Sequence, residues 1–521
     1  MTTNKGTLPS NTILALVIFY LALLLIETFL QVIFPWDKLS WPETPFLTDM
    51  MKLNSHLPVF TPPSDCNSFV YSPGLEYWTF ALLKPFGLNL DIRFCRVVNV
   101  LIGMLVALIG TLAIARVVKL KSPLAAGRTF YFISWGILWL LLSQSVTSDL
   151  PHPDNLHLLH AVIVLWLCFD AAEGKKYGQA IVTMIVAGVG IFAKQTDVCA
   201  WMGPAIVFVL LKPWDRAWIF LLALVGAAMA GLSLYLLWLP QYAKLFTFDL
   251  LSHQKVDPGK IIVLIKDPFS AGRAVLLALT VIACARLWSW HGAGRHYLIC
   301  CGAIGFFTAA PNFFAYLKIN GIANNLTVFE IWMALILLPV CAIWLEHWSK
   351  PREPAGSPME ESDSQKFARA TYFLLIAWVA MLVPIKGIPT QQNYDYCRAI
   401  ESAVREDVHH GRRILITNGA AFYTRAGVFA PPLDQGNSYL EIALGGREDL
   451  LHDTKARIDN HYYDRIYLTK DSFYTDEMLA EMNRQYRIES VIPAPPSTGK
   501  LWRIIGLRSW LMTDCKILVP R

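Results

Sequence analysis

The chain has 521 residues, of which 55% are hydrophobic and only 16% are charged, and its mean hydropathy is +0.42. Apolar runs of about twenty residues alternate with short charged stretches, a pattern that indicates a polytopic membrane protein and excludes an ordinary soluble core. The net charge of +6 does not indicate a nucleic-acid partner, because much of the Lys and Arg lies in short loops between the runs.

Hydropathy predicts an α-helical polytopic membrane protein of about 11 transmembrane helices. The first run is too long for a removed signal peptide and lacks a small-residue cleavage site, so we expect it to remain as an anchor. The predicted spans are residues 12–35, 92–118, 129–147, 155–172, 177–194, 197–212, 217–239, 272–290, 296–315, 325–345 and 368–387.

From residue 390 the composition becomes polar. The short β-like runs RRILITN, DRIYLT and YRIESVI alternate there with helical runs, which is typical of a small α/β domain. The sequence therefore predicts two domains, a transmembrane domain over residues 1–389 and a soluble α/β domain over residues 390–521.

The basic residues of alternate loops fall on one side of the predicted bundle, and the positive-inside rule makes that side cytoplasmic. The opposite face then receives residues 36–91 and 240–271, the link between spans nine and ten, and the α/β domain. Most of the unusual polar residues lie on this non-cytoplasmic face. The basic residues that set the orientation are Lys119, Lys121, Arg128, Lys175, Lys176, Lys212, Arg216, Arg286, Arg295, Lys350 and Arg352.

The outer loop after the first span, residues 36–91, contains the acids Glu43 and Asp49. Pro42 and Pro45 stiffen the backbone around Glu43 close to the membrane surface, so this carboxylate could take a proton from a hydroxyl as a general base. Asp49 lies six residues on, and in a helix the two side chains point to different faces. Asp37 and Asp65 are explained as ordinary solvated charge.

The stretch SDLPHPDNLHLLH joins spans three and four. Asp154 either caps the fourth span or, as an acid just inside a span, marks a functional site. His152 and Asp154 could ligate a metal, but the ligand set is incomplete. His157 and His160 fit better as residues that line the interior or the interface, and no metal site is predicted.

Two cations lie at span ends on the same face. Lys194, in GVGIFAKQTD, either snorkels to the surface or meets an anion such as a lipid-linked phosphate. Arg93, at the start of the second span, has the same two explanations.

The link FAYLKINGIANNLTVFEIW, between spans nine and ten, is rich in groups that bind sugar hydroxyls. Asn324 and Asn325 offer amides. Glu330 would be partly buried in the apolar zone, which makes it hard to explain as loop charge.

Taken in order, these segments resemble the GT-C superfamily of polytopic glycosyltransferases, in the branch related to protein O-mannosyltransferases and the lipid A aminoarabinose transferase (glycosyltransferase families 39 and 83). WPETPFLTDMMKLNSHLPVF and FVYSPGLEYW look like the acid-bearing outer loop of that branch, which contains membrane-parallel helices. HPDNL looks like its Asp after Pro at the fourth span, and FAKQTD and KINGIANNLTVFE are similar to further segments. The acidic pair typical of the loop is a single Glu43 here, which leaves both Glu43 and Asp49 open as the base.

The resemblance implies a GT-C-like fold and an inverting glycosyltransferase that moves a hexosyl or pentosyl group from a polyprenyl-phosphate donor to a lipid, glycan or protein acceptor. It implies a multi-pass protein of the inner or plasma membrane, with the active site and the α/β domain on the extracytoplasmic side. No cofactor is obligatory, although some relatives bind a divalent cation. The catalytic candidates are Glu43, Asp49 and Asp154; the donor-phosphate candidates are Arg93, Lys194 and Lys318; the sugar or acceptor candidates are Tyr71, His152, Gln195, Asn324, Asn325 and Glu330.

A transporter or flippase of a lipid-linked sugar is the alternative, since acids and cations at span ends also serve translocation. It predicts charged residues near the membrane midplane and inverted repeats. The sequence shows neither, because its polar residues gather at one face. A membrane-anchored binding protein is a third interpretation, and it leaves the number of spans unexplained.

Overall fold

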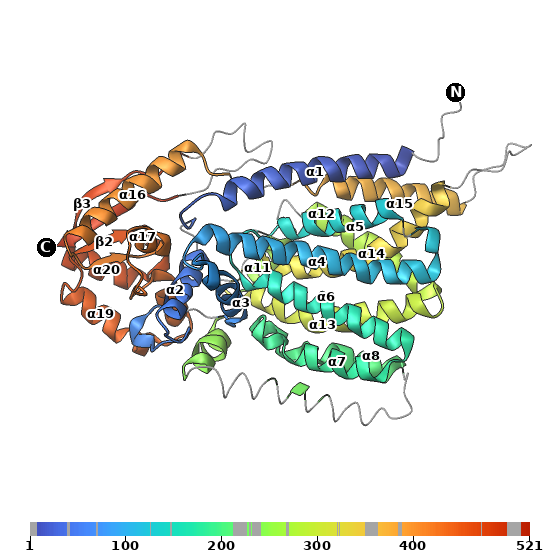
Figure 1. Cartoon of the computed structure of the whole chain (residues 1–521), viewed down its shortest axis with the longest axis horizontal. Helices are drawn as coiled ribbons and strands as arrows, with labels where there is room; N and C mark the ends of the chain where they lie inside the picture. Colours follow the sequence, from blue (N-terminus) through green and yellow to red (C-terminus); the bar gives the residue numbers. More distant parts are fainter. Residues whose placement is uncertain are drawn as a thin grey trace, which may run out of the picture.

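The computed structural model describes most of the chain, and Figure 1 shows a bundle of long helices with a smaller α/β domain at one end. The long helices run side by side along the long axis of the molecule. The residues described are 8–38, 42–68, 71–125, 127–145, 148–211, 224, 227–228, 231, 241–266, 270–319, 321, 324–349, 363–383, 388–469, 471–496 and 512–521.

The bundle is built from apolar helices at the positions that hydropathy predicts. Within the described residues, six helices (α1, α4, α6, α12, α13 and α14) are long and apolar enough to cross a membrane, and α5, α7, α8 and α15 are shorter apolar helices. The predicted span 217–239 lies almost wholly outside the described residues. The bounds are α1 (Leu8–Val32), α4 (Ile92–Lys121), α5 (Arg128–Ser143), α6 (Pro153–Gly174), α7 (Tyr177–Gly188), α8 (Met202–Leu211), α12 (Ser270–Ser289), α13 (Ala293–Leu317), α14 (Asn324–Ser349) and α15 (Asp363–Ala380).

The predicted spans 177–194 and 197–212 are shorter as regular helices than hydropathy indicates. α7 ends at Gly188, and two 3-10 turns, η4 (Gly190–Phe192) and η5 (Gln195–Cys199), separate it from α8. Hydropathy extends the first of these spans too far because residues 189–193 are themselves apolar. Lys194 therefore lies between the two turns.

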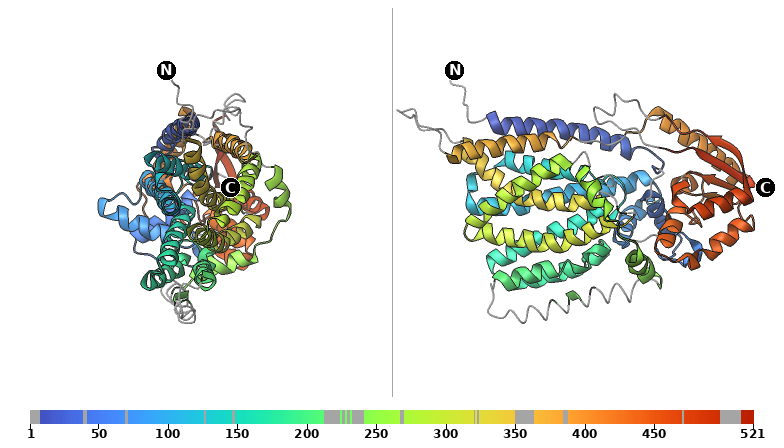
Figure 2. Two further views of the ribbon diagram at one scale, coloured as in Figure 1. Left: turned by 90° about the vertical axis from the view of Figure 1, so that its right-hand side faces the viewer. Right: turned by 180° about the vertical axis from the view of Figure 1, so that it is seen from behind.

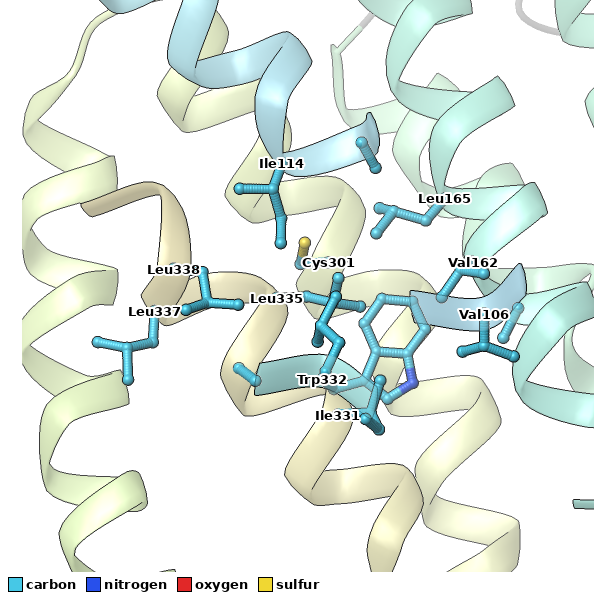
Figure 3. Packing of buried hydrophobic residues seen from close by; sticks show 14 of the residues in the cluster. Val106, Ile114, Val162, Leu165, Cys301, Ile331, Trp332, Leu335, Leu337 and Leu338 are labelled. Carbon is cyan, nitrogen blue, oxygen red and sulfur yellow. The ribbon is translucent and has the colours of Figure 1, made fainter. Parts of the chain in front are cut away.

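The interior of the bundle is packed with side chains from several helices. In Figure 3, Trp332 and Leu335 of α14 lie among Val106 of α4, Val162 of α6 and Cys301 of α13. These five side chains are all buried. A helix that is apolar on most sides is expected in the core of a bundle or in a membrane.

Short helices from the two outer segments lie between the bundle and the α/β domain, as Figures 1 and 2 show. The loop 36–91 contains short helices. Its elements are α2 (Glu43–Asn54), η1 (Pro63–Asp65), α3 (Gly74–Leu83) and η2 (Lys84–Phe86), and the second outer segment forms η6 (Leu245–Asp249), α10 (Leu250–His253) and α11 (Gly259–Lys266).

The α/β domain contains a four-stranded sheet in the order β1-β2-β4-β3. β1 pairs with β2 in parallel, and β4 pairs antiparallel with both β2 and β3. β1, β2 and β3 fall on the predicted β-like runs, whereas β4, at the end of the chain, is an additional strand that joins them. The bounds are β1 (Ile414–Ile416), β2 (Arg465–Leu468), β3 (Tyr486–Ile492), β4 (Cys515–Pro520), α16 (Gln391–His409), α17 (Ala420–Arg425), α18 (Gly436–Leu444), η7 (Glu448–Leu451), α19 (His452–Asp459), η8 (Asp471–Phe473) and α20 (Asp476–Gln485).

The α/β domain is hydrogen-bonded to the outer loop. The backbone N–H groups of Asp434 and Gln435 donate to the carbonyls of Asp65 and Cys66, each at 2.9 Å. The Gln435 side chain donates from Nε2 to Thr48 Oγ1 at 2.6 Å. Buried apolar side chains continue the contact, among them Phe46, Met50, Ile400 and Phe422. The outer loop thus fixes the domain over one end of the bundle.

Candidate functional site

A cavity of about 450 Å³ lies where the bundle, the outer segments and the α/β domain meet. Its walls come from the chain before α3, the η5 turn, the η6–α10 segment, α13, the start of α14, and α18. The polar residues that line it are Tyr71, Lys194, Gln195, Thr196, Thr247, Ser252, Gln254, Lys318, Asn324, Asn325 and Glu441.

Lys194 lines the cavity, and its side chain is only 3% exposed, so it does not snorkel to the surface. Its ammonium donates to Asp154 Oδ1 at 2.6 Å, to Asn312 Oδ1 at 2.8 Å and to Asn325 Oδ1 at 3.1 Å. An ammonium has three N–H donors. Lys194 is therefore held in one orientation, with two neutral amides that an anion could replace.

Asp154 lies directly behind Lys194, at the start of α6. Its Oδ2 accepts from Asn324 Nδ2 at 2.5 Å and lies 2.9 Å from His152 Nδ1. His152 is the N-cap residue of α6, and its side chain accepts from the backbone N–H of Asp154. The capping role considered for Asp154 therefore falls to His152, and the carboxylate is used to hold Lys194.

A chain of hydrogen bonds leads from Lys194 into the bundle. Asn312, whose Oδ1 faces Lys194, donates from Nδ2 towards His157 Nε2 at 3.1 Å. An Nε2 that accepts leaves the proton on Nδ1, and His157 Nδ1 lies 2.7 Å from Asp197 Oδ1. Asp197 Oδ2 lies 3.4 Å from His160 Nδ1. His157 and His160 are interior residues, as predicted, and they connect three helical segments behind the cavity.

Two glycines allow the backbone to pack closely around this site. A Cβ at Gly190 would lie 2.2 Å from His160 Cε1, and a Cβ at Gly74 would lie 1.9 Å from the carbonyl oxygen of Phe192. Neither position accepts a larger residue without a shift. The close contact at Gly74 brings the start of α3, and with it Tyr71, against the segment between α7 and α8 that contains Lys194.

The cavity reaches a surface of the bundle. Phe314 on the membrane-spanning helix α13 lines the cavity and is 64% exposed. Val198 of the neighbouring η5 turn also lines it and is exposed. Large apolar side chains exposed on a spanning helix indicate a lipid-facing surface, so an apolar chain could enter the cavity from the side.

Six residues predicted from the sequence line the cavity together: Tyr71, Lys194, Gln195, Lys318, Asn324 and Asn325. Lys318 follows α13, and its ammonium donates to the carbonyl of Leu251. Burial and the negative charges of Glu441 and Asp154 raise the pKa of the Tyr71 phenol well above its usual value. The cavity thus combines two ammonium groups, four amides, one carboxylate and one phenol that stays protonated.

Glu43 does not line the cavity. Its side chain is fully buried, and Arg96 donates to it from Nε to Oε1 at 2.6 Å and from Nη2 to Oε2 at 3.0 Å. The backbone N–H of Lys38 donates to Oε2 at 2.6 Å. In this structure, both oxygens of the predicted base are engaged by fixed donors.

Asp49 is also buried on α2, and its Oδ1 lies 3.7 Å from Lys52 Nζ, too far for a hydrogen bond. Burial raises the pKa of Asp49 to about 7, although Lys52 opposes this. Glu76 on α3 adds a second buried carboxyl whose pKa burial and Asp49 raise well above its usual value. Neither acid lines the cavity, and Asp49 points to a different face of α2 from Glu43, as its spacing indicates.

Arg93 and Glu330 also lie away from the cavity, and each forms an ion pair with another residue of the protein. Arg93 is partly exposed at the start of α4 and forms an ion pair with Asp91, with Nη2 and Oδ2 2.5 Å apart. Glu330 is buried on α14 and pairs with Arg273 Nε at 2.5 Å. The structure therefore does not bring these two predicted site residues to the cavity wall.

Metal-ligating side chains are not grouped in the part of the chain that the structure describes, where no three His, Cys, Asp or Glu residues could hold an ion together. His152 and Asp154 are adjacent, but both Asp154 oxygens already accept from Lys194 and Asn324. These two residues do not fit a divalent-cation site.

The sequence analysis did not identify Glu441, Gln254 or Asn312. Glu441 is an ordinary acid in a helix of the α/β domain, and Gln254 lies in an outer segment without a recognisable motif. Asn312 lies within a span, where a polar residue is a signal for a functional site. Only Asn312 could therefore have been found from its sequence context.

The bundle, the outer loop and the terminal α/β domain together form a fold that is known from a solved structure. Among solved structures, ArnT from Cupriavidus metallidurans in the apo state is similar, with a TM-score of 0.54 over 96% of this chain and 97% of ArnT. The two sequences are 11% identical. This similarity confirms the predicted fold class.

A second structure, ArnT from Cupriavidus metallidurans bound to undecaprenyl phosphate, aligns over the same shares of both chains with a TM-score of 0.47 and 12% identity. No family model matches the sequence, and no curated protein matches it.

Proposed function

We propose that this protein is an inverting glycosyltransferase that moves a sugar from a polyprenyl-phosphate donor to an acceptor on the non-cytoplasmic side of the membrane. One observation carries the proposal: a single cavity contains two ammonium groups and several sugar-binding amides and also reaches the lipid-facing surface at Phe314. A lipid-linked sugar phosphate offers an apolar tail, an anion and hydroxyl groups in that combination. The fold supports this function.

The donor would lie with its lipid tail along Phe314 and its phosphate near Lys194 and Lys318. A phosphate oxygen can replace Asn325 Oδ1, the most distant of the three Lys194 partners at 3.1 Å, while Asp154 keeps the ammonium in position. Gln195, Asn324 and Tyr71 would then border the space that the sugar occupies. We derive these roles from the groups that line the cavity.

The reaction is a single displacement. The acceptor hydroxyl attacks the anomeric carbon as the bond from that carbon to the phosphate oxygen breaks, and the polyprenyl phosphate leaves with the electron pair. Negative charge develops on the departing phosphate, where buried, preorientated cations stabilise the transition state more than the ground state. Attack opposite the leaving group inverts the configuration of the sugar.

The orientation is part of the proposal. The cavity lies at the end of the bundle near the α/β domain, whereas Lys119, Lys121, Lys175 and Lys176 lie near the opposite ends of α4 and α6. The positive-inside rule makes the basic end cytoplasmic. The cavity and the α/β domain would then face the extracytoplasmic side of a multi-pass membrane protein.

The test is to incubate the purified protein with a panel of polyprenyl-phosphate sugars and to follow donor consumption. We expect the wild type to consume at least one donor and Lys194→Met to be on the order of 100-fold slower, the cost of losing one preorganised charge-stabilising donor. Lys176→Met is the matched control, because Lys176 is an exposed lysine paired with Asp170 away from the cavity.

Equal donor consumption by Lys194→Met and the wild type would contradict the role of the cavity. If the wild type consumes no donor but moves a lipid-linked sugar between the leaflets of a vesicle, the protein is a transporter.

A further inference from the structure

Asp197 is a fully buried carboxylate to which the proposed function gives no role. It belongs to the η5 turn, but it does not line the cavity as its neighbour Thr196 does. Its oxygens face two rings of α6: Oδ1 lies 2.7 Å from His157 Nδ1, and Oδ2 lies 3.4 Å from His160 Nδ1. Within the described part of the chain, neither oxygen has a hydrogen-bond partner other than these rings. A buried charge is retained only with partners, so the two histidines must serve as its partners.

Asn312 links Lys194 to His157, and its amide can take only one orientation. Its Oδ1 accepts from the Lys194 ammonium at 2.8 Å. Its Nδ2 donates to the carbonyl of Thr308 at 2.7 Å and lies 3.1 Å from His157 Nε2. An ammonium only donates and a carbonyl only accepts, so both neighbours select the same orientation. The second N–H of the amide therefore points at His157 Nε2, which must accept it.

His157 has two neutral tautomers, and only one of them fits these contacts. With the proton on Nδ1, the ring accepts from Asn312 through Nε2 and faces Asp197 through Nδ1. With a proton on Nε2, two donors would face each other at 3.1 Å, and the amide would be pushed away from Lys194. A carboxylate only accepts, so Asp197 selects the tautomer that fits.

His160 and Gly190 fix the other side of Asp197. His160 Nε2 lies 2.8 Å from the carbonyl oxygen of Val186, so this nitrogen carries a proton. The opposite nitrogen of the same ring then faces Asp197. Gly190 leaves the space that the ring needs, since a Cβ there would lie 2.2 Å from His160 Cε1. The carboxylate is thus set in place by α6, the end of α7 and the η4 turn.

We propose that Asp197 is a positioning residue: it fixes the imidazole beside Asn312, so that Asn312 Oδ1 stays turned towards Lys194. This inference rests on the glycosyltransferase function proposed above, in which Lys194 stabilises the departing phosphate. When a phosphate oxygen replaces Asn325 Oδ1, Asp154 and Asn312 are the partners that remain. Two fixed acceptors leave the third N–H of the ammonium aimed at the phosphate.

The test begins with Asp197→Asn, assayed with the polyprenyl-phosphate sugar that the wild type consumes. Asn has nearly the shape of Asp but can donate as well as accept, so it no longer selects one tautomer of His157. We expect kcat to fall about tenfold, because Lys194 keeps its ion pair with Asp154 but aims its N–H less well at the leaving phosphate. The Kd of the donor should change by less than about threefold, since this interaction strengthens as charge develops in the transition state.

Two variants of His157 separate the direction of the hydrogen bonds from packing. His157→Gln keeps a donor and an acceptor in one side chain, so its kcat should stay within about threefold of the wild type. His157→Leu keeps an apolar volume but neither group, and its kcat should fall about tenfold. Nitrogen NMR of the histidine rings reports the tautomer, and the signal that His157→Leu removes belongs to His157. We expect Nδ1–H in the wild type and a mixture of tautomers in Asp197→Asn.

A double variant tests whether Asp197 acts through Asn312. Asp197→Asn combined with Asn312→Ala should be no slower than Asn312→Ala alone, because both changes affect the same acceptor of Lys194. Asp170→Asn is the matched control. Asp170 is an acid near the other end of α6, paired with Lys176 away from the cavity, and its loss should leave kcat unchanged.

An unchanged kcat in Asp197→Asn, or losses that multiply in the double variant, would overturn the positioning role but not the proposed function. A His157 ring that keeps Nδ1–H in Asp197→Asn while kcat falls would also overturn it. If Asp197→Asn does not fold, the two His157 variants decide, and equal kcat values for them would contradict the proposal. Absence of turnover in the wild type with every donor would instead contradict the proposed function itself.

Discussion

Two buried ion pairs lie near the same end of the bundle, and their surroundings differ. In the first, Arg96 directs all five guanidinium N–H groups at fixed acceptors: two at Glu43 and three at the carbonyls of Gln31, Phe34 and Trp36. In the second, Lys194 binds Asp154 and two neutral amides at the wall of a cavity.

Burial alone does not distinguish these pairs, because Glu43 and Lys194 are both shielded from solvent. The difference lies in which partners can be exchanged. The Glu43–Arg96 pair joins the chain after α1 to α4 and leaves no donor for a ligand, whereas Lys194 can exchange an amide for an anion. A buried charge that borders a cavity is thus the stronger candidate for chemistry.

The largest expected effect is on stability, from Arg96→Met. This change leaves the Glu43 carboxylate buried without its cation and three carbonyls without a donor, which costs about 3–5 kcal/mol. We expect a large fall in the thermal unfolding temperature. Arg93→Met on the same helix is the control, since a partly exposed pair contributes about 1 kcal/mol or less. Equal unfolding temperatures for the two variants would contradict the role of Arg96.

A pH effect on stability is expected at Asp49. Its Oδ1 lies 3.7 Å from Lys52 Nζ, whereas the Glu43–Arg96 and Asp154–Lys194 pairs are both hydrogen-bonded. Burial raises the pKa of Asp49 to about 7 from its usual 3.8, so between these values the native state holds a proton that the unfolded chain has released. The unfolding free energy must therefore fall as pH rises through this window, by at most about 1.4 kcal/mol per pH unit.

Asp49→Asn removes that proton uptake. The difference in thermal unfolding temperature between Asp49→Asn and the wild type should therefore increase in favour of the variant from pH 5 to pH 7. Lys52 still carries its charge in this range, because burial lowers its pKa only to about 8. If the thermal unfolding temperatures of the two proteins differ by the same amount at every pH in this range, the raised pKa of Asp49 is excluded.

The smallest expected effect is catalytic and comes from Asn312→Ala. This variant removes one acceptor of Lys194 and cuts the link to His157 and Asp197, so the ammonium loses part of its orientation. We expect kcat/KM to fall about tenfold, which corresponds to about 1.4 kcal/mol. Thr308→Val is the control, because Thr308 lies one turn earlier on α13 and donates only to carbonyls of its own helix. Similar values of kcat/KM for both variants would show that the hydrogen bonds through Asn312 do not position Lys194.

Much of the fold could be predicted because the bilayer requires long apolar helices, which hydropathy detects directly. The break between α7 and α8 was predicted to be shorter than it is, since the residues just after α7 have the composition of a span. β4 was missed as well: it lies between β2 and β3, and such pairing depends on residues far apart in the sequence.

The candidate site could be predicted where a polar residue stands out against apolar surroundings. Lys194, Asn324 and Asn325 were found in that way, and they line the cavity. Glu43 and Glu330 stand out equally, and the sequence could not indicate that Arg96 and Arg273 bind them. Glu441 gave no signal because an acid in a soluble helix is ordinary.

The sequence by itself determined the membrane class, most helices and the α/β fold of the last segment, because each follows from local composition. Only the tertiary structure decided which charged residues neutralise one another and which border a cavity. Those outcomes depend on partners from distant segments: Arg96 for Glu43, Asp154 for Lys194, and the docking of α18 for Glu441. Electrostatic and hydrogen-bond pairing acts over a few ångströms in space, and sequence spacing does not encode that distance.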